Sequence, residues 1–397
     1  MIKEISITNF KVFKDCTTFS NLKPITILTG INGRGKSSTL QTLLLLRQSI
    51  MTNEWTKDVY LNSHYVNLGS VKDVRNESSE PDEPITFKIV DEQYSFDFQL
   101  QPRQDSDQFL RLASLNINGS SVSVDESMHN LLPNNAEIQQ SSFAKALSRM
   151  QYIGAERLGP QLSYASSNDD INIGAKGEYA AKLLYIHKQD GVSDQWIQNS
   201  LRLFPKLNEE NIEVRNVQGL LNFWLSQMFG HTTLKSTYVE EANVYTLHLN
   251  IFNRQNESKP TNIGFGYSYC YPLLLAGLVA KQGDVVIFEN PEAHLHAKAQ
   301  SIFGQFIGVL ASQDVQVFVE THSEHVINGI RIALLSGINI QTDAAKIIYF
   351  YQRNDDDGVI YKSIDIEPNG DMTDFPADFL DQQRYDLLRI IQLANTQ

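Results

Sequence analysis

The sequence is poor in several features that would have pointed to particular protein classes. It has only two cysteines, Cys16 and Cys270, in 397 residues, too few for a disulfide framework or a four-cysteine zinc site. It contains no run of about 18 apolar residues, the length that a membrane-spanning helix requires. Its first residues lack the charged-then-apolar order of a signal peptide. We therefore expect a cytoplasmic protein without a membrane partner.

Positive charge is also scarce. The chain has 33 lysines and arginines against 46 acidic residues, a formal net charge of −13, and its basic residues are scattered singly. Because lysine and arginine supply most of the non-specific affinity for nucleic acid, the composition gives no sign of DNA or RNA binding. A basic patch assembled by folding is left open.

One segment near the N-terminus has the pattern of a nucleotide-binding loop. Residues 30–37 read G-I-N-G-R-G-K-S, after an apolar stretch at 25–28 that predicts a strand and before a helix predicted over 39–48. In such a loop the backbone N–H groups face the phosphates, the lysine reaches the β- and γ-phosphates, and the serine hydroxyl binds Mg²⁺. We expect ATP and Mg²⁺ to bind through Asn32, Gly33, Gly35, Lys36, Ser37 and Ser38.

Two further buried strands end in polar residues. Four apolar residues at 285–288 lead to Glu289, which we expect to hold Mg²⁺ together with Ser37, because ligands bind at the carboxyl ends of the strands in open α/β sheets. Another buried strand, beginning at Val317, ends in Thr-His-Ser at 321–323. His322 is therefore a candidate contact to the γ-phosphate or to the attacking water.

A glycine-containing turn lies upstream of the Glu289 strand. Residues 264–268 read G-F-G-Y-S, just before an apolar helix expected over 271–280. Such a turn can present N–H groups and a hydroxyl to a phosphate. Since the chain already has its own phosphate loop, we expect Gly266 and Ser268 to contact ATP in trans. Two protomers would then sandwich ATP in a homodimer or higher homo-oligomer.

The remaining pattern predicts an α/β fold. Residues 5–13 predict an edge strand, and the alternation over 85–100 with the turn pair Asn118-Gly119 predicts an antiparallel β region. Residues 140–230 read as helical, and strand–helix alternation then indicates a parallel sheet whose last strand is 346–351. Residues 355–358 favour a turn. We divide the chain into 1–135, with the phosphate loop, a mainly helical insert over 136–240, and 241–397, with the other motifs.

Taken in order, these motifs resemble the ABC-type ATPase head of the SMC/RecF/OLD class. The match rests on Asn9-Phe10-Lys11, G-I-N-G-R-G-K-S-S, the turn upstream of the acid strand, and T-H-S. More narrowly, the chain is similar to a bacterial family of AAA-type ATPases of unassigned function, many of them encoded in antiphage defence loci. That match rests on Y-I-G-A-E-R-L-G-P (152–160), G-A-K-G-E (174–178), G-F-G-Y-S, E-N-P-E-A-H-L-H (289–296), E-T-H-S-E-H (320–325) and D-F-P-A-D-F-L-D (374–381). It implies a mixed P-loop sheet with an antiparallel β region and a helical insert.

One departure from the wider ABC pattern affects catalysis. Where that class has an Asp-Glu pair after the acid strand, this chain has Glu289 and Asn290, and an amide cannot accept a proton as a carboxylate does. Glu292 is our candidate general base in its place. The expected catalytic residues are thus Glu292, Glu289 and His322, with slow, Mg²⁺-dependent ATP hydrolysis.

The resemblance also bears on what the ATPase would control. No sustained heptads lie between residues 37 and 264, so the long arms of SMC proteins are not expected. No second acidic constellation follows, as the nuclease domain of OLD proteins requires. We therefore expect a separate effector subunit, such as a nuclease or toxin, regulated in antiphage defence. Two alternatives stay open: a RecF-like ATP-dependent DNA clamp in repair, and an ATP-binding scaffold that does not hydrolyse.

Overall fold

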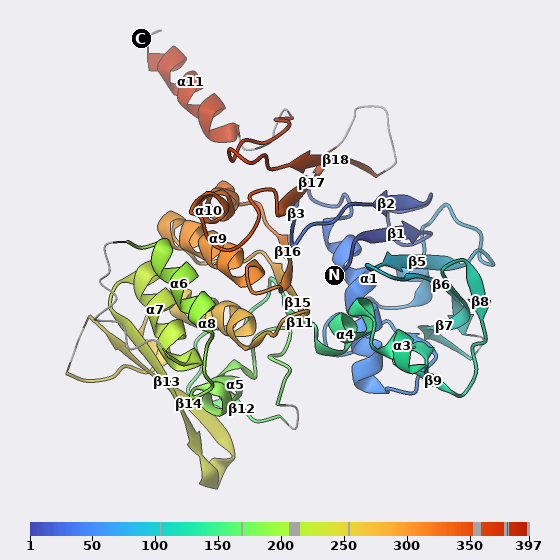
Figure 1. The fold of residues 1–397 in the computed structure, drawn as a ribbon, viewed down its shortest axis with the longest axis horizontal. Helices are drawn as coiled ribbons and strands as arrows, with labels where there is room; N and C mark the ends of the chain where they lie inside the picture. Colours follow the sequence, from blue (N-terminus) through green and yellow to red (C-terminus); the bar gives the residue numbers. More distant parts are fainter. Residues whose placement is uncertain are drawn as a thin grey trace.

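The computed structural model describes residues 1–394 apart from 104, 168–169, 206–214, 253–254, 352–358, 377–378 and 380. Its centre is a six-stranded sheet (Figure 1). In spatial order the strands are β11 (Gln151–Ile153), β15 (Val285–Glu289), β16 (Gln316–Glu320), β3 (Ile25–Gly30), β17 (Ala345–Tyr351) and β18 (Ile360–Asp365). The first five run parallel and β18 pairs antiparallel with β17. The predicted α/β fold with a parallel sheet is confirmed.

Both faces of this sheet are buried, because its strands are apolar on both sides. Val286 and Phe288 of β15 pack into one core, and Val285 and Ile287 into the other. The first core includes α5 (Ala180–His187), α6 (Asp194–Arg202), α7 (Val217–Phe229), α8 (Phe265–Val279), α9 (Ala297–Ala311) and α10 (Glu324–Leu335). The second includes α1 (Lys36–Thr52), α4 (Ser142–Arg149) and the antiparallel sheet. The central sheet thus lies between two packed halves (Figure 1).

The predicted antiparallel region is confirmed. Its strands, in spatial order, are β2 (Thr17–Phe19), β1 (Glu4–Thr8), β5 (Ile85–Val90), β6 (Ser95–Arg103), β7 (Ser106–Ile117) and β4 (Asp58–Tyr60), with β8 (Ser120–Val122) paired to β7. Asn118 and Gly119 have φ of 51° and 78°, as the tight turn between β7 and β8 requires. The prediction of an edge strand over 5–13 is wrong. β1 ends at Thr8 and is paired on both sides, because the left-handed residues Asn9 and Lys11 turn the chain back.

The prediction that residues 140–230 are helical is confirmed for α4 to α7, but this segment also contains two strands that were not predicted. β11 pairs with β15 at the edge of the central sheet, and β12 (Tyr164–Ala165) pairs with β14 (Val244–Ile251). Strands of two or three residues are too short to show periodicity. β14 also pairs with β13 (Thr232–Val239), so the predicted boundary at residue 240 falls between two paired strands. The three-part division stays a prediction.

The C-terminal part also differs from expectation. β18 follows the strand predicted to be the last, and the turn predicted at 355–358 lies outside the described residues. α11 (Gln382–Ala394) then extends away from the rest of the chain (Figure 1). The remaining short elements are α2 (Val71–Val74), α3 (Ala136–Gln139), β9 (Met128–His129) and β10 (Leu132–Pro133). Within the described part of the chain, none of the helices has the length and apolar character needed to cross a membrane.

Candidate nucleotide-binding site

The phosphate loop lies where β3 leaves the sheet and α1 begins. Gly30 has a φ of 115°, and a Cβ there would lie 2.0 Å from the carbonyl oxygen of Phe350, so only glycine fits. Gly35 is the N-cap of α1 and provides no side chain to cap it. The N–H groups at the start of this 17-residue helix therefore face the loop, an arrangement that binds phosphate.

Lys36 is held inside the loop by the loop itself. Its Nζ donates to the carbonyl oxygens of Gly30 and Ile31 at 2.9 Å and to Oδ1 of Asn32 at 3.3 Å. Lys36 is only 3% exposed, and this burial lowers its pKa. Phosphate oxygens can replace the three acceptors around Nζ, and the contacts of Asn32 and Lys36 with ATP stay a prediction. Gly33 lies in the same loop, and Ser38 follows it in α1.

An acidic pair faces the phosphate loop. The Ser37 hydroxyl donates to Oε1 of Glu320 at 3.0 Å, and Glu320 lies directly opposite Glu289 in the pairing of β16 with β15. Burial raises the pKa of Glu289 to about 7, with a further contribution from the charge of Glu320. Burial also raises the pKa of Glu320. Two carboxyl groups are thus crowded together beside Ser37.

This arrangement fits a divalent cation. Oε2 of Glu320 is buried and has no hydrogen-bond partner in the part of the chain that the structure describes, although such atoms are usually paired. Mg²⁺ prefers oxygen ligands from one or two carboxylates and phosphates, and Ser37, Glu289 and Glu320 would hold it here. Sequence reasoning missed Glu320. The signal in the sequence is that Glu320 ends a buried strand, as Glu289 does. The prediction for this strand named only His322.

Glu292 is fixed by the neighbouring strand end. Its Oε2 accepts from the Thr321 hydroxyl at 2.7 Å, and its Oε1 accepts from the His322 backbone N–H at 2.8 Å. The imidazole of His322 is exposed, and partial burial and the charge of Lys36 lower its pKa. The structure therefore brings Lys36, Glu292 and His322 together, and their roles in catalysis stay a prediction.

Asn290, which stands at the position where a catalytic acid was expected, contributes through its backbone. Its φ of 44° is a left-handed conformation that asparagine tolerates better than most residues. Its N–H donates to the Glu320 carbonyl at 2.8 Å, and its own carbonyl accepts from Nη2 of Arg157 at 3.0 Å. Turn geometry therefore gives a physical reason for asparagine here.

Two residues that the sequence did not single out support the acid strand. The Tyr152 hydroxyl donates a hydrogen bond to Oε2 of Glu289 at 3.0 Å. Arg157 is 4% exposed and also donates to the carbonyl oxygen of Glu289 at 3.2 Å. Burial lowers the pKa of Arg157 to about 10. Both residues lie in the 152–160 motif, so this motif positions the loop that carries Glu289 and Glu292.

The G-F-G-Y-S segment does not form a turn ahead of a helix at 271. α8 already begins at Phe265, so Gly266 and Ser268 lie in its first turn. Only Gly264 precedes the helix, in an extended conformation with no side-chain cap. The two glycines favour the prediction of a turn. In the structure, Phe265 and Tyr267 of this segment belong to the helix.

The orientation of this helix limits what it can offer to a nucleotide. Ser268 is 3% exposed and hydrogen-bonds with Tyr164 inside the protomer. Gly264 and Phe265 are exposed, Phe265 by 55%. A phosphate from another molecule would therefore meet the backbone N–H groups at the start of α8. The contacts of Gly266 and Ser268 in trans stay a prediction.

A large open cavity adjoins the tip of the phosphate loop. Its volume is about 1020 Å³. The residues around it include Gly33 and Arg34 of the loop, Lys11 and Phe13 from the turn after β1, and Arg75 after α2. The space is large enough for the base and ribose of a nucleotide whose phosphates lie in the loop.

Comparisons with known proteins concern the family and the fold. A sequence model described as "AAA ATPase domain" matches residues 1–327. No curated protein matches the chain. Among solved structures, an SMC head bound to the C-winged helix domain of ScpA has 12% identity and a TM-score of 0.51, over 93% of this chain and 98% of that one.

Two more SMC heads are similar at lower TM-scores. The head domain from Thermotoga maritima has 13% identity and a TM-score of 0.43, over 91% of this chain and 98% of that one. A head with an extended coiled coil, bound to the C-terminal domain of ScpA derived from Pyrococcus furiosus, has 13% identity and a TM-score of 0.47, over 99% of both chains. At such identities the first structure shows the shared fold alone.

Proposed function

The chain belongs to the AAA ATPase domain family, and on that premise we propose that it binds ATP with Mg²⁺ at the loop 30–37 and hydrolyses it slowly. The observation that carries this proposal is the meeting of Ser37, Glu289 and Glu320 beside the buried Lys36. Mg²⁺ held there would bridge the phosphates and neutralise the charge that develops on them.

In this proposal the residues around the nucleotide have separate roles in binding and in catalysis. Lys36 and the N–H groups of α1 bind the phosphates, and the cavity beside Gly33 and Arg34 takes the nucleoside. Glu292 accepts a proton from the attacking water, and the two hydrogen bonds from Thr321 and His322 fix its orientation.

We further propose that ATP joins two copies of the chain, with the start of α8 from one protomer on the γ-phosphate bound to the other. The uncapped N-terminus of α8 and the exposed Gly264 support this role. A side chain at Gly264 meets no atom within 4 Å. Gly264→Asp should therefore cap the helix without disturbing the fold, but it places a negative charge against the phosphate.

Light scattering tests the dimer. The Glu292→Gln variant should have the mass of a dimer with Mg-ATP and of a monomer without it. Adding Gly264→Asp should keep it a monomer, whereas the neutral Gly264→Asn should leave the dimer intact. A monomer under all conditions, or a dimer that tolerates Gly264→Asp, would refute the sandwich.

For the biological role, we propose a separate effector subunit, a nuclease or toxin regulated by the ATP state in antiphage defence. A known SMC head of this fold binds a winged-helix domain of another protein. Here α11 carries six exposed large apolar side chains, Tyr385, Leu387, Leu388, Ile390, Ile391 and Leu393, and such surfaces often mark protein contacts. Purification of the tagged chain, expressed with its native gene neighbours, should recover a stoichiometric partner. Leu388→Ser with Ile391→Ser should release that partner.

Asn290 favours a second candidate, an ATP-binding scaffold without turnover. That candidate predicts ATP-driven dimers and no release of phosphate by the wild-type protein. A homodimer that retains duplex DNA only with ATP, and has no protein partner, would instead favour the RecF-like clamp.

A further inference from the structure

Arg47 is a buried arginine without a partner among the described residues. It lies on α1 and is 7% exposed. Within that part of the chain, its Nε has no hydrogen-bond partner and no carboxylate forms an ion pair with it. Burying an unpaired charge is costly, so such groups are normally paired. Arg47 could not be predicted from the sequence, because a helical pattern does not show whether a charged side chain has an ion-pair partner.

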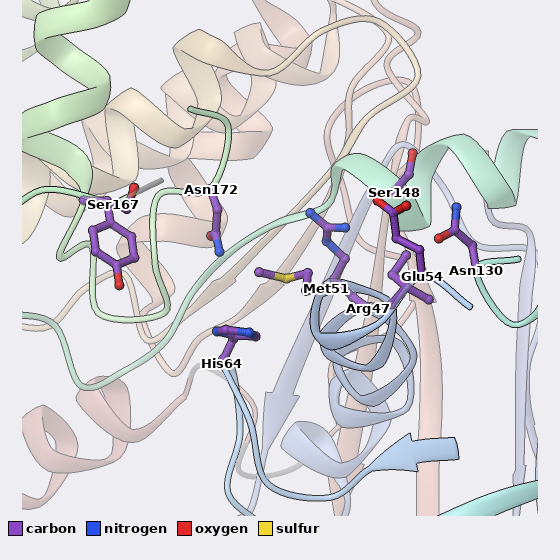
Figure 2. A pocket seen from close by; sticks show the side chains of 10 residues that line it. Arg47, Met51, Glu54, His64, Asn130, Ser148, Ser167 and Asn172 are labelled. Atoms are coloured by element: carbon purple, nitrogen blue, oxygen red, sulfur yellow. The ribbon is translucent and has the colours of Figure 1, made fainter. Parts of the chain in front are cut away.

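The guanidinium points into a cavity. In Figure 2 it extends from α1 into the space between the loop that carries Asn172 and the helix that carries Ser148. The cavity has a volume of about 440 Å³, within the range of small-molecule sites. Its other residues are mostly polar and include His64, Asn130, Ser167 and Tyr179.

Among the described residues that line this cavity, the one carboxylate does not neutralise the arginine. Glu54 is at the rim, with its side chain 69% exposed, and its Oε2 lies 3.7 Å from Nε2 of His129. Arg47 follows Lys36 by 11 positions on α1, which is about 16 Å at 1.5 Å per residue. The cavity is therefore a separate site from the phosphate loop.

We propose that this cavity binds a small molecule through an oxyanion group, phosphate or carboxylate, with Arg47 as its charged partner. A guanidinium presents a planar set of donors that matches both groups. His64, Asn130 and Ser148 line the same cavity and can hydrogen-bond the rest of the ligand. A bound oxyanion would give Arg47 the anionic partner that the described residues do not supply.

The test uses a background in which the phosphate loop is disabled. In Lys36→Ala protein, thermal unfolding is measured against inorganic phosphate and against acetate, with chloride at the same ionic strength as reference. A saturable rise in Tm with either anion supports the site and shows which group it prefers. Adding Arg47→Gln should weaken that binding at least about tenfold. Arg389→Gln, an exposed arginine on α11, should leave it unchanged.

Stability without ligand distinguishes a binding residue from a structural one. Arg47→Gln and Arg47→Met should unfold at the same temperature as the parent or higher, because an unpaired buried charge is removed. Lower unfolding temperatures for both variants would show that Arg47 is structural and would overturn the proposal. So would the absence of a saturable effect from either anion, or binding that survives both substitutions.

Discussion

The hydroxyl of Ser37 donates a hydrogen bond to Oε1 of Glu320 across 3.0 Å. The two residues are 283 positions apart. Ser37 lies in the first turn of α1, and Glu320 is the last residue of β16. Their contact joins the phosphate loop to the strand that precedes Thr321 and His322. Because Oε2 of Glu320 is buried and has no hydrogen-bond partner among the described residues, this contact marks the place where a cation would bind.

Glu320→Gln should weaken ATP binding only when Mg²⁺ is present. The amide can still accept from Ser37, but it supplies no charge to a cation, so we expect about a tenfold loss or more. The measurement is ATP affinity by calorimetry with Mg²⁺ and with EDTA. Glu241→Gln, at an exposed position, serves as control. An equal loss in EDTA would place Glu320 in the fold and not in a metal site.

The raised pKa of Glu289 predicts that the metal-free protein loses stability as pH rises. The folded protein keeps the proton up to about pH 7, whereas the unfolded chain releases it near the ordinary value. Between those values the folded state binds more protons, so increasing pH favours unfolding, by roughly 3 kcal/mol in total. Denaturant unfolding from pH 5 to 8 should therefore show a steeper decline for wild type than for Glu289→Gln. Parallel curves would contradict this.

Arg157→Met should destabilise the protein. The guanidinium donates to the carbonyl oxygens of Glu289 and Asn290. Methionine removes both hydrogen bonds, although the Asn290 carbonyl still accepts from the Ala293 N–H, so we expect a cost of about 1–3 kcal/mol. The change should appear as a lower Tm and as weaker Mg²⁺-dependent ATP binding. An unchanged Tm would show that water replaces the arginine without loss.

Thr321→Val should slow turnover without weakening ATP binding. Valine keeps the shape of threonine but removes the hydroxyl that donates to Glu292, so the carboxylate is less well oriented. We expect the turnover rate to fall about fivefold to tenfold, measured beside the ATP dissociation constant. Thr86→Val in β5, on the antiparallel sheet, should change neither. A loss of affinity with normal turnover would argue against this role.

The sequence was sufficient where the signal was local. The phosphate loop, the acid strand ending at Glu289 and the antiparallel alternation over 85–100 each show their pattern within a few residues. Glu320 was missed because its importance depends on strand register, which places it opposite Glu289 and beside Ser37. Arg157 was missed because its acceptors are backbone carbonyls more than 130 positions away, and carbonyls have no sequence signature.

The missed strand β11 has the same physical origin. It has three residues, and its place at the sheet edge depends on pairing with β15. The position of Ser268 likewise depends on packing: its hydroxyl, in the first turn of α8, hydrogen-bonds with Tyr164, and its contact with a second copy stays a prediction.

The most direct test of the account is a single-turnover measurement of ATP hydrolysis with enzyme in excess and Mg²⁺ present. Wild type should convert bound ATP to ADP. Glu292→Gln should bind ATP with similar affinity and hydrolyse it at least about a hundredfold more slowly, as loss of a general base implies. Lys36→Ala should not bind. Hydrolysis by Glu292→Gln at the wild-type rate would contradict the account, because no other carboxylate is assigned that role.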